Sequence, residues 1–512
     1  MKNFKKASIA LLAGALACVN VFGLASCTKG GGNDGGSSYV PKEITAYDGS
    51  EVTVTFYHTM GEGLRNILDE YIPDFNAMYP NIKIEHDTMG DYPALREQIM
   101  TELSAGNSPS LAYCYPDHVA LYQKARKAVV LDDYIASQKT VTRADGTTEI
   151  MGYTDAQVAD FISAYYNEGR AYGTTADGTD LMYTLPITKS TEVMYYNKTV
   201  FDENGWTVPT TWDEMEVLCQ KIKAKYPTDI PFGYDSEANW FITMTEQLGT
   251  PYTSATGDHF LFNTAENRAF VEKFRGWYEK GYVTTEEIYG NYTSNLFKEV
   301  NPSKQKIYMC IGSSAGATYQ CPAKVATPVL DKDGKPVIDP ETGAPKETQE
   351  FPFEVGVAMI PQANPEKPKV IQQGPSVCLF KKANEQEMAA AWLFAKFLTT
   401  SVEFQASVSM NNGYTAVIKS VQQNEIYADF LAKADGNAGL QATVVKKTLE
   451  QADIDGAYYI SPAFNGSSAA RDKVGILLQN CLVSKPSGNQ TVADLIKSQF
   501  DAAIEALEYD YS

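Results

Sequence analysis

The alternation of apolar and polar residues near the start of the chain's body predicts a strand, a helix and a second strand. Residues 52–56 alternate between apolar and polar side chains, which is typical of a strand. Over residues 64–78 the apolar residues recur at steps of three and four, which indicates one buried face of a helix. Pro80 and Asn81 end that pattern, and residues 82–85 alternate again. A strand, a helix and a strand in close succession form a βαβ unit, which implies a parallel sheet covered by helices.

The same mixture of periods continues to the C-terminal end, so the predicted fold class is α/β. Further strands are expected at residues 111–115 and 194–196, and further helices at residues 96–103, 212–224, 265–278, 386–398 and 492–507. The helix over 212–224 has a clear start, because Thr211 can cap it and Asp213 and Glu214 stand in its first turn. Residues 329–338 interrupt this order and predict an exposed hairpin that turns at an Asp-Gly pair.

The first 27 residues predict a secretory signal. Three lysines within the first six residues precede an apolar run over 7–23, which is too short for a comfortable membrane span. The run closes on Leu24-Ala25-Ser26-Cys27, which resembles the lipobox of bacterial lipoproteins. That resemblance implies that Cys27 receives lipid and becomes the new N-terminus; the alternative is an ordinary signal peptide with an incidental cysteine. Residues 28–44 then predict a flexible tether, because their first part is rich in Gly and Ser.

Length and composition bound the rest of the chain. With 512 residues, the chain is too long for one ordinary core and suits two domains. It is 44% apolar and 21% charged and has no second long apolar run, so we expect a water-soluble body that is anchored rather than membrane-spanning. Its net charge of −20 argues against nucleic acid as a partner, which demands clusters of Lys and Arg.

The cysteines of the body do not predict a disulfide scaffold. Of eight cysteines, Cys18 lies in the signal and Cys27 in the lipobox-like ending. The other six are scattered and form no C-x-x-C pair, so buried free thiols are favoured. A bridge between Cys310 and Cys321, the only close pair, stays open.

Catalytic and metal-binding signatures are absent from the sequence. We find no G-x-S-x-G, H-E-x-x-H or Walker lysine loop, so we expect a protein that is not an enzyme and that uses no cofactor or metal. The four histidines, His58, His86, His118 and His259, are isolated in sequence, which favours structural or solvated roles. A glycosidase pair of carboxylates stays open, because its two acids can be far apart in the chain. The 32 tyrosines suit sugar stacking, although core packing must account for most of them.

The most specific motif is Leu-Pro-Ile-Thr-Lys-Ser-Thr-Glu-Val-Met-Tyr-Tyr-Asn-Lys over residues 185–198, followed by Phe201, Gly205, Pro209 and Thr211-Trp212. It resembles the signature of the extracellular solute-binding proteins of ABC importers, in their carbohydrate-binding, maltose-binding-like group. Residues 56–60, 90–92, 233–240, 355–361, 395–398 and 412–414 extend the resemblance over almost the whole mature chain, within the branch that includes glycerol-3-phosphate-binding proteins.

The resemblance implies an α/β, two-lobed periplasmic-binding-protein fold of type II, with hinge-linked lobes and a central ligand cleft. Lobe 1 would take residues 45–187 and 352–400, and lobe 2 residues 188–351 and 401–512. Carried over by position, the residues expected to line the cleft are Tyr57, His58, Tyr92, Tyr115, Ser190, Trp240, Ser314, Gly374, Ser376 and Tyr414. For Trp240 the alternative is a place in the core of lobe 2.

Two departures from the branch bear on the ligand. Gln373-Gly374 replaces a pair of glycines, and the segment over 458–466 has no arginine for a phosphate, the next one being Arg471. Lys189 could substitute only as a point charge, and it joins the expected ligand-binding residues. The sequence therefore favours a sugar or oligosaccharide over a phosphate ligand.

The resemblance thus predicts a monomeric lipoprotein, anchored on the extracytoplasmic face of the cell membrane, that delivers this carbohydrate to the transmembrane subunits of an ABC permease. One alternative is a binding protein for glycerol-3-phosphate or a glycerophosphodiester. A second is a surface lipoprotein that degrades glycans or acts as a sensor.

Overall fold

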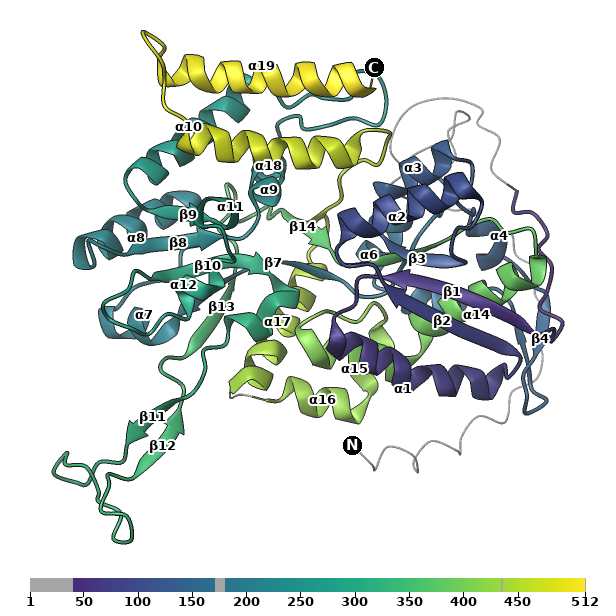
Figure 1. The fold of residues 1–512 in the computed structure, drawn as a ribbon, viewed down its shortest axis with the longest axis horizontal. Helices are drawn as coiled ribbons and strands as arrows, with labels where there is room; N and C mark the ends of the chain where they lie inside the picture. Colours follow the sequence, from purple (N-terminus) through teal and green to yellow (C-terminus); the bar gives the residue numbers. More distant parts are fainter. Residues whose placement is uncertain (1–39, 171–179, 434–435, 512) are drawn as a thin grey trace. The chain divides into compact units, whose positions relative to one another are not determined.

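The computed structural model describes residues 40–170, 180–433 and 436–511. The predicted signal, the predicted lipidation site Cys27 and most of the predicted tether lie outside these residues. Within them, a first sheet has the strand order β2-β1-β3-β15-β6 (Figure 1). Its strands are β1 (Val52–His58), β2 (Ile82–Thr88), β3 (Leu111–Cys114), β6 (Leu185–Pro186) and β15 (Ser376–Leu379). β1 pairs in parallel with β2 and β3, whereas β15 runs antiparallel to both β3 and β6.

The helices of this lobe follow the periods of the sequence. In Figure 1, α2 (Tyr92–Ala105) and α3 (His118–Lys124) lie on one side of β1 and β2, and α1 (Glu62–Met78) and α15 (Val402–Asn412) on the other. The remaining helices here are α4 (Asp132–Ile135), α5 (Asp155–Asp160), α6 (Ser163–Asn167), η1 (Glu168–Arg170), α14 (Glu385–Thr400), η3 (Lys419–Gln423), α16 (Glu425–Leu431) and α17 (Gly436–Ala452), with a small ladder of β4 (Thr140–Thr142) and β5 (Thr148–Ile150). The βαβ unit predicted from residues 52–85 is confirmed.

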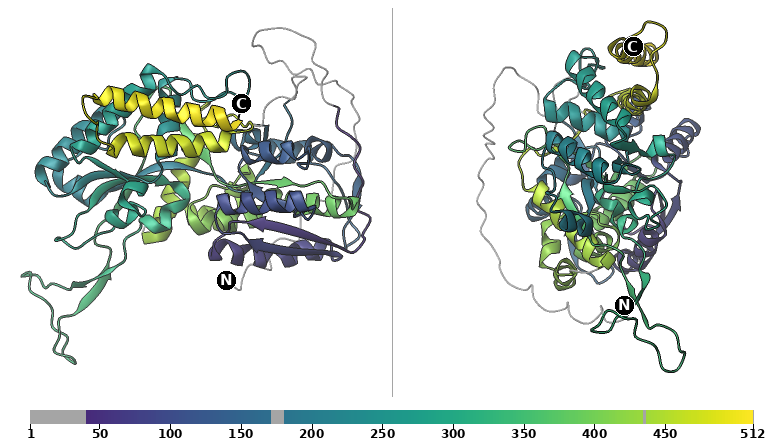
Figure 2. Two further views of the ribbon diagram at one scale, coloured as in Figure 1. Left: turned by 45° about the horizontal axis from the view of Figure 1, so that its top comes forward. Right: turned by 90° about the vertical axis from the view of Figure 1, so that its left-hand side faces the viewer.

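The second sheet has the order β16-β14-β7-β10-β8-β9, and β13 also pairs with β7. Its strands are β7 (Ser190–Asn197), β8 (Ile230–Tyr234), β9 (Val283–Thr285), β10 (Ile307–Ser313), β13 (Val355–Met359), β14 (Val370–Gln373) and β16 (Tyr458–Tyr459). Its helices are α7 (Lys198–Asn204), α8 (Trp212–Lys225), α9 (Glu237–Leu248), α10 (Ala265–Glu279), α11 (Glu286–Tyr289), α12 (Ser294–Phe297), η2 (Ser314–Gly316), α13 (Ala317–Gln320), α18 (Ser467–Val483) and α19 (Val492–Tyr511). Figure 2 shows α18 and α19 side by side.

Separate hydrophobic clusters support the two sheets. Phe56, Trp392 and Phe394 belong to the first cluster, and Trp240 and Phe274 to the second. The first cluster also contains side chains of α15 and α16, although the sequence-based boundaries assign everything after residue 400 to lobe 2. The reason is local: Ser401 caps both the end of α14 and the start of α15, and α15 packs back on α1, so the chain remains in the first lobe beyond residue 400.

An exposed arm leaves the second lobe between residues 325 and 350. It is the antiparallel ladder of β11 (Val325–Pro328) and β12 (Glu347–Glu350), and every residue of β12 is exposed (Figures 1 and 2). The predicted hairpin is present at its tip, where Leu330 bridges Pro336 and Gly334 adopts a φ of +77°. The body's six cysteines are free thiols, and the thiol of Cys310 contacts Gln320 and Thr293 rather than Cys321.

A buried ion pair lies where the chain passes between the sheets. The segments between β6 and β7 and between β14 and β15 meet at Lys189, whose side chain is fully buried. Its ammonium donates to the Glu168 carboxylate, to the Gly374 carbonyl at 3.1 Å and to Ser376 Oγ at 2.9 Å. Gly374 has a φ of +96°, and a Cβ there would stand 2.6 Å from the Thr188 carbonyl oxygen. We call this crossing between the sheets the hinge. It has no room for a side chain at Gly374, and Lys189 supplies the cation for the buried Glu168 carboxylate.

Trp240 belongs to the core of the second lobe, so the structure does not support the cleft role predicted for it. It is fully buried on α9, its ring stacks on Tyr234 at 5.0 Å and it lies 4.2 Å from the ring of Phe274. The resemblance assigned Trp240 to the cleft by its place in the motif order, but no sequence pattern showed that its ring packs against Phe274 of α10.

Replacing Lys189 with methionine should reduce the free energy of unfolding by about 3–5 kcal/mol, because the Glu168 carboxylate would stay buried without its cation. Urea denaturation followed by circular dichroism measures this loss. Lys198→Met is the matched control, because Lys198 pairs with Asp202 and Glu354 at the surface and should contribute about 1 kcal/mol or less. Equal, small losses in both variants would contradict a structural role for the buried pair.

Replacing Trp240 with alanine should reduce the stability of the protein by about 3–5 kcal/mol, as expected for removal of a large ring from a packed core. Thermal melting without any ligand measures this. A variant that melts like the wild type would show that Trp240 does not support the core of the second lobe.

Candidate ligand cleft

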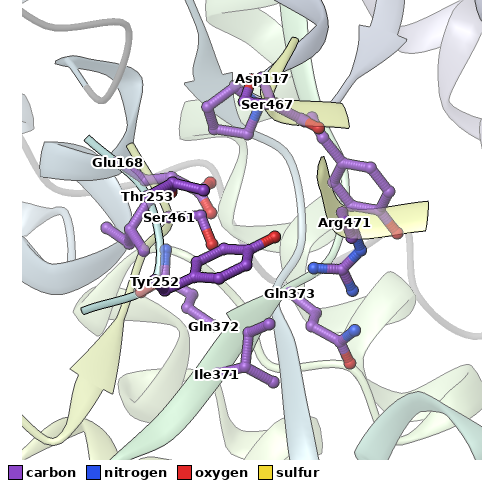
Figure 3. A pocket seen from close by; sticks show the side chains of 13 residues that line it. Asp117, Glu168, Tyr252, Thr253, Ile371, Gln372, Gln373, Ser461, Ser467 and Arg471 are labelled. Atoms are coloured by element: carbon purple, nitrogen blue, oxygen red, sulfur yellow. The ribbon is translucent and has the colours of Figure 1, made fainter. Parts of the chain in front are cut away.

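Two adjoining cavities share Gln373 and Arg471, and the first of them lies between segments of the two lobes. The first cavity, of about 60 Å³, is lined by Tyr115, Pro116, Asp117, Glu168, Tyr252, Thr253, Ile371, Gln372, Gln373, Ile460, Ser461, Ser467 and Arg471 (Figure 3). The second cavity, of about 540 Å³, lies against the second sheet and is lined mainly by residues of β7, β10, α9, α11, α12 and α13. We refer to the two together as the cleft.

Tyr115 lines the first cavity and stacks on Tyr92 behind it. Tyr115 follows directly after β3, and Tyr92 is the first residue of α2, where Asp91 caps the helix by accepting a hydrogen bond from Ala94 N at 2.9 Å. The two rings stack with their centroids 4.2 Å apart and an interplanar angle of 27°. Burial raises the pKa of Tyr115, and the neighbouring Tyr414 adds to this effect, so the three phenols are neutral and close together.

Several buried polar groups around the first cavity lack hydrogen-bond partners among the described residues. Both amide ends of Gln372, which is 6% exposed, are unpaired, as are the hydroxyls of Tyr252 and Ser461. Figure 3 shows these three side chains gathered on one side, with Arg471 and Gln373 across from them. A buried polar group without a partner is costly, so this arrangement suits a ligand that brings its own donors and acceptors.

Charged groups of the second lobe complete the cleft. Arg471, on α18, donates to Asn239 Oδ1, and Asn239 in turn donates to Glu192 at 2.9 Å. Glu192 also accepts from the Tyr234 hydroxyl at 2.5 Å, and burial raises the pKa of its carboxyl to about 7. Across the first cavity, Asp117 accepts from Ser468 Oγ at 2.6 Å, which joins α18 to the start of α3.

The structure brings together only part of the predicted site. Tyr115 lines the first cavity, and Tyr92 and Tyr414 adjoin it. Ser190 pairs with Gln373 on the floor of the cleft. Ser314 lies beside the second cavity, but its hydroxyl accepts from Thr191 N at 3.1 Å.

Three predicted residues belong to the hinge instead. The ammonium of Lys189 already serves three acceptors, so none of its three N–H donors remains for a phosphate. Gly374 and Ser376 supply two of those acceptors. The predicted role of Lys189 as a ligand residue is therefore not supported by its contacts.

Tyr57 and His58 contact other protein groups. The Tyr57 hydroxyl donates to Glu102 at 3.2 Å. His58 Nε2 lies 2.9 Å from His86 Nδ1, and His86 Nε2 lies 2.9 Å from Asp69. Burial lowers the pKa of His58 to about 3, so its ring is neutral. The two histidines are distant in sequence, but the parallel register of β1 and β2 pairs them, and the contacts of His58 are those of a structural residue. The described residues contain no cluster suited to a metal ion.

Sequence reasoning missed the polar residues of the second lobe. Arg471 stands beyond the segment searched for a phosphate-binding arginine, and only the packing of α18 on α9 brings it into the cleft. Asp235 and Asn239 stand close together at the start of α9, whereas Glu286 comes from α11, and no motif in the sequence links the three.

Known proteins resemble this chain in sequence and in fold. Residues 70–438 match the family model described as bacterial extracellular solute-binding protein. A multiple sugar-binding protein of Streptococcus mutans is 27% identical over 198 residues, which cover 39% of this chain and 40% of that protein. The sn-glycerol-3-phosphate-binding periplasmic protein of Shigella flexneri is 25% identical over 208 residues, 40% of this chain and 42% of that protein. The matched segments thus span well under half of these relatives.

Solved structures share the fold over most of the chain. The cyclic alpha-maltosyl-1,6-maltose binding protein from Arthrobacter globiformis has a TM-score of 0.62 at 16% identity, covering 90% of this chain and 100% of that chain. UgpB from Mycobacterium tuberculosis, in complex with glycerophosphocholine, has a TM-score of 0.63 at 14% identity, covering 90% and 99%. These likenesses confirm the predicted two-lobed fold of type II.

No helix among the described residues is long and apolar enough to cross a membrane. The family model covers well over half of the chain, and the fold agrees with it. The protein therefore belongs to the bacterial extracellular solute-binding proteins, which work outside the cytoplasm.

Proposed function

We propose that this protein is the substrate-binding component of an ABC importer, and that it captures a sugar or oligosaccharide in the cleft and delivers it to the permease. The stacked Tyr92 and Tyr115 beside the unpaired groups of Gln372, Tyr252 and Ser461 carry this proposal. Aromatic rings pack on the apolar faces of sugars, and the polar groups can pair with sugar hydroxyls. The multiple sugar-binding relative and the maltose-binding likeness in fold support the same ligand class.

A phosphate ester is the second candidate, because Arg471 lines both cavities. A guanidinium is the usual partner of a phosphate. The sequence favoured a neutral ligand because residues 458–466 contain no arginine, and Arg471 removes that reason. Against it, Asp117, Glu168 and Glu192 line the same cleft and would repel a phosphate.

Capture without catalysis fits the state of three of the cleft carboxylates. Glu168 is held by Lys189, Asp117 by Ser468 and Glu192 by Tyr234 and Asn239, so each already serves a protein donor. We expect the two lobes to close on the ligand around the hinge at Lys189, as hinge-linked lobes do in proteins of this kind. We also propose that the mature protein is a monomer held to the membrane by lipid on Cys27.

Replacing Tyr115 with alanine should weaken carbohydrate binding by roughly thirty-fold, since loss of an aromatic anchor costs about 2 kcal/mol. Isothermal titration calorimetry with maltotetraose, cellotetraose and the chitin tetramer identifies the tightest of these ligands for the wild type. The variant is then titrated with that sugar, after a melting curve has shown that it is folded.

Tyr509→Ala is the matched control, because Tyr509 is 88% exposed and lines neither cavity. Mass spectrometry should recover the bound sugar unchanged. Undiminished affinity in the Tyr115 variant, or binding of none of the sugars by the wild type, would contradict the carbohydrate proposal. Steady conversion of the sugar would instead indicate an enzyme.

Replacing Cys27 with serine should move the protein from the membrane fraction to the soluble fraction, because lipid would supply most of its membrane affinity. Fractionation of cells followed by immunoblotting measures this. Retention of the variant on membranes after washes with high salt and carbonate would place the anchor elsewhere.

A further inference from the structure

Three carboxylates from separate elements line the second cavity. Glu192 comes from β7, Asp235 follows β8, and Glu286 begins α11. Lys298 and Arg471 are the basic residues among the cavity's lining, and Arg471 acts on Glu192, whose pKa it lowers against the larger effect of burial. Among the described residues, no lysine or arginine forms an ion pair with Asp235 or Glu286.

The surroundings of Asp235 and Glu286 do not neutralise them. Asp235 accepts hydrogen bonds from Thr293 N at 2.7 Å and Thr293 Oγ1 at 2.6 Å, and burial still raises its pKa. Burial raises the pKa of Glu286 to about 7, and the nearby carboxylates of Asp235, Glu237 and Glu287 add to the shift. This part of the cavity therefore has an uncompensated negative charge once both groups ionise.

An unpaired acceptor and two aromatic rings also line this cavity, together with Lys298 and the polar side chains of Ser236, Ser294 and Asn295. Gln320 is only 3% exposed and lines the cavity, and its Oε1 has no hydrogen-bond partner among the described residues. Its Nε2 is already directed to Cys310 Sγ at 3.3 Å, so the carbonyl end is the one left unpaired. Tyr292 and Tyr319 line the same space and are 58% and 69% exposed. Their rings can face a ligand directly.

We infer that the second cavity binds a positively charged ammonium group of the ligand, between the carboxylates of Asp235 and Glu286, the carbonyl of Gln320 and the rings of Tyr292 and Tyr319. Carboxylates form charge-assisted hydrogen bonds with an ammonium group, and tyrosine rings attract cations. The inference rests on the proposed function, and it then names the ligand class as a glycan with unacetylated amino sugars. A quaternary ammonium, as in a choline ester, shares this chemistry and is distinguished by the experiment.

Three tetrasaccharides with the same β-1,4 backbone test the inference: cellotetraose, the chitin tetramer and its fully deacetylated form, which differ at C2 by a hydroxyl, an acetamide or an ammonium group. By calorimetry near neutral pH, the deacetylated tetramer should bind the wild type about tenfold or more tightly than cellotetraose. Glu286→Gln and Asp235→Asn should each reduce the ratio of the two affinities to about twofold or less, whatever the affinity for cellotetraose itself.

Glu287→Gln is the matched control, because Glu287 neighbours Glu286 on the same helix but is exposed and does not line the cavity. It should keep the preference. Melting curves of all variants show whether they are folded; should Asp235→Asn unfold, Glu286→Gln, at a partly exposed position, still tests the inference.

The outcomes separate this inference from the proposed function. Equal affinity for the three sugars would leave the carbohydrate proposal standing and overturn the ammonium subsite. Binding of glycerophosphocholine but not of sn-glycerol-3-phosphate or any sugar, with loss in Glu286→Gln, would support the ammonium subsite and overturn the carbohydrate proposal. Stabilisation by calcium chloride alone that Glu286→Gln abolishes would mean a metal site and would overturn the inference.

Discussion

The ammonium group of Lys189 is the constraint on which the arrangement of the cleft depends. It has three donors, and Glu168, Gly374 and Ser376 accept all three where the chain passes between the sheets. Because β14 pairs with β7 directly beside this point, Gln372 lies opposite Thr191 and Gln373 opposite Ser190. The buried ion pair thus fixes the position of Gln372 and Gln373, because their partners on β7 stand one or two residues from Lys189. Glu168 belongs to the ion pair and also lines the first cavity.

Local periodicity predicted several of the longer regular elements, because an alternating strand or an amphipathic helix encodes which side is buried. The βαβ unit over residues 52–85 and the helix that starts after Thr211 are examples, the latter with its capping box present. Long-range packing was beyond the sequence. The return of α15 onto α1 depends on contacts such as Tyr71 with Phe404, whose centroids lie 5.7 Å apart, and no local pattern predicts them.

The same distinction explains which site residues could be predicted. Tyr92 and Tyr115 stand at the ends of recognisable elements, so the family resemblance could assign both residues to the cleft by their position. The sequence also assigned Lys189 and Trp240 to the cleft. Both side chains are buried away from it, and burial depends on the packed fold rather than on the local sequence. Arg471 and the carboxylates of the second cavity come from elements that are distant in sequence. The net charge of −20 does not reveal these cavity carboxylates, because most of the 63 acidic residues lie on the surface.

The cleft therefore combines a tyrosine wall from the first lobe, unpaired polar groups near the hinge and an acidic, aromatic end in the second lobe. The central claim is that one carbohydrate molecule spans these surfaces. A crystal structure of the protein with its tightest-binding tetrasaccharide tests it most directly. The account predicts a sugar ring packed on Tyr92 or Tyr115, with a hydroxyl hydrogen-bonded to the Gln372 amide; a sugar bound elsewhere, for example at the base of the exposed arm near Phe351, would contradict it.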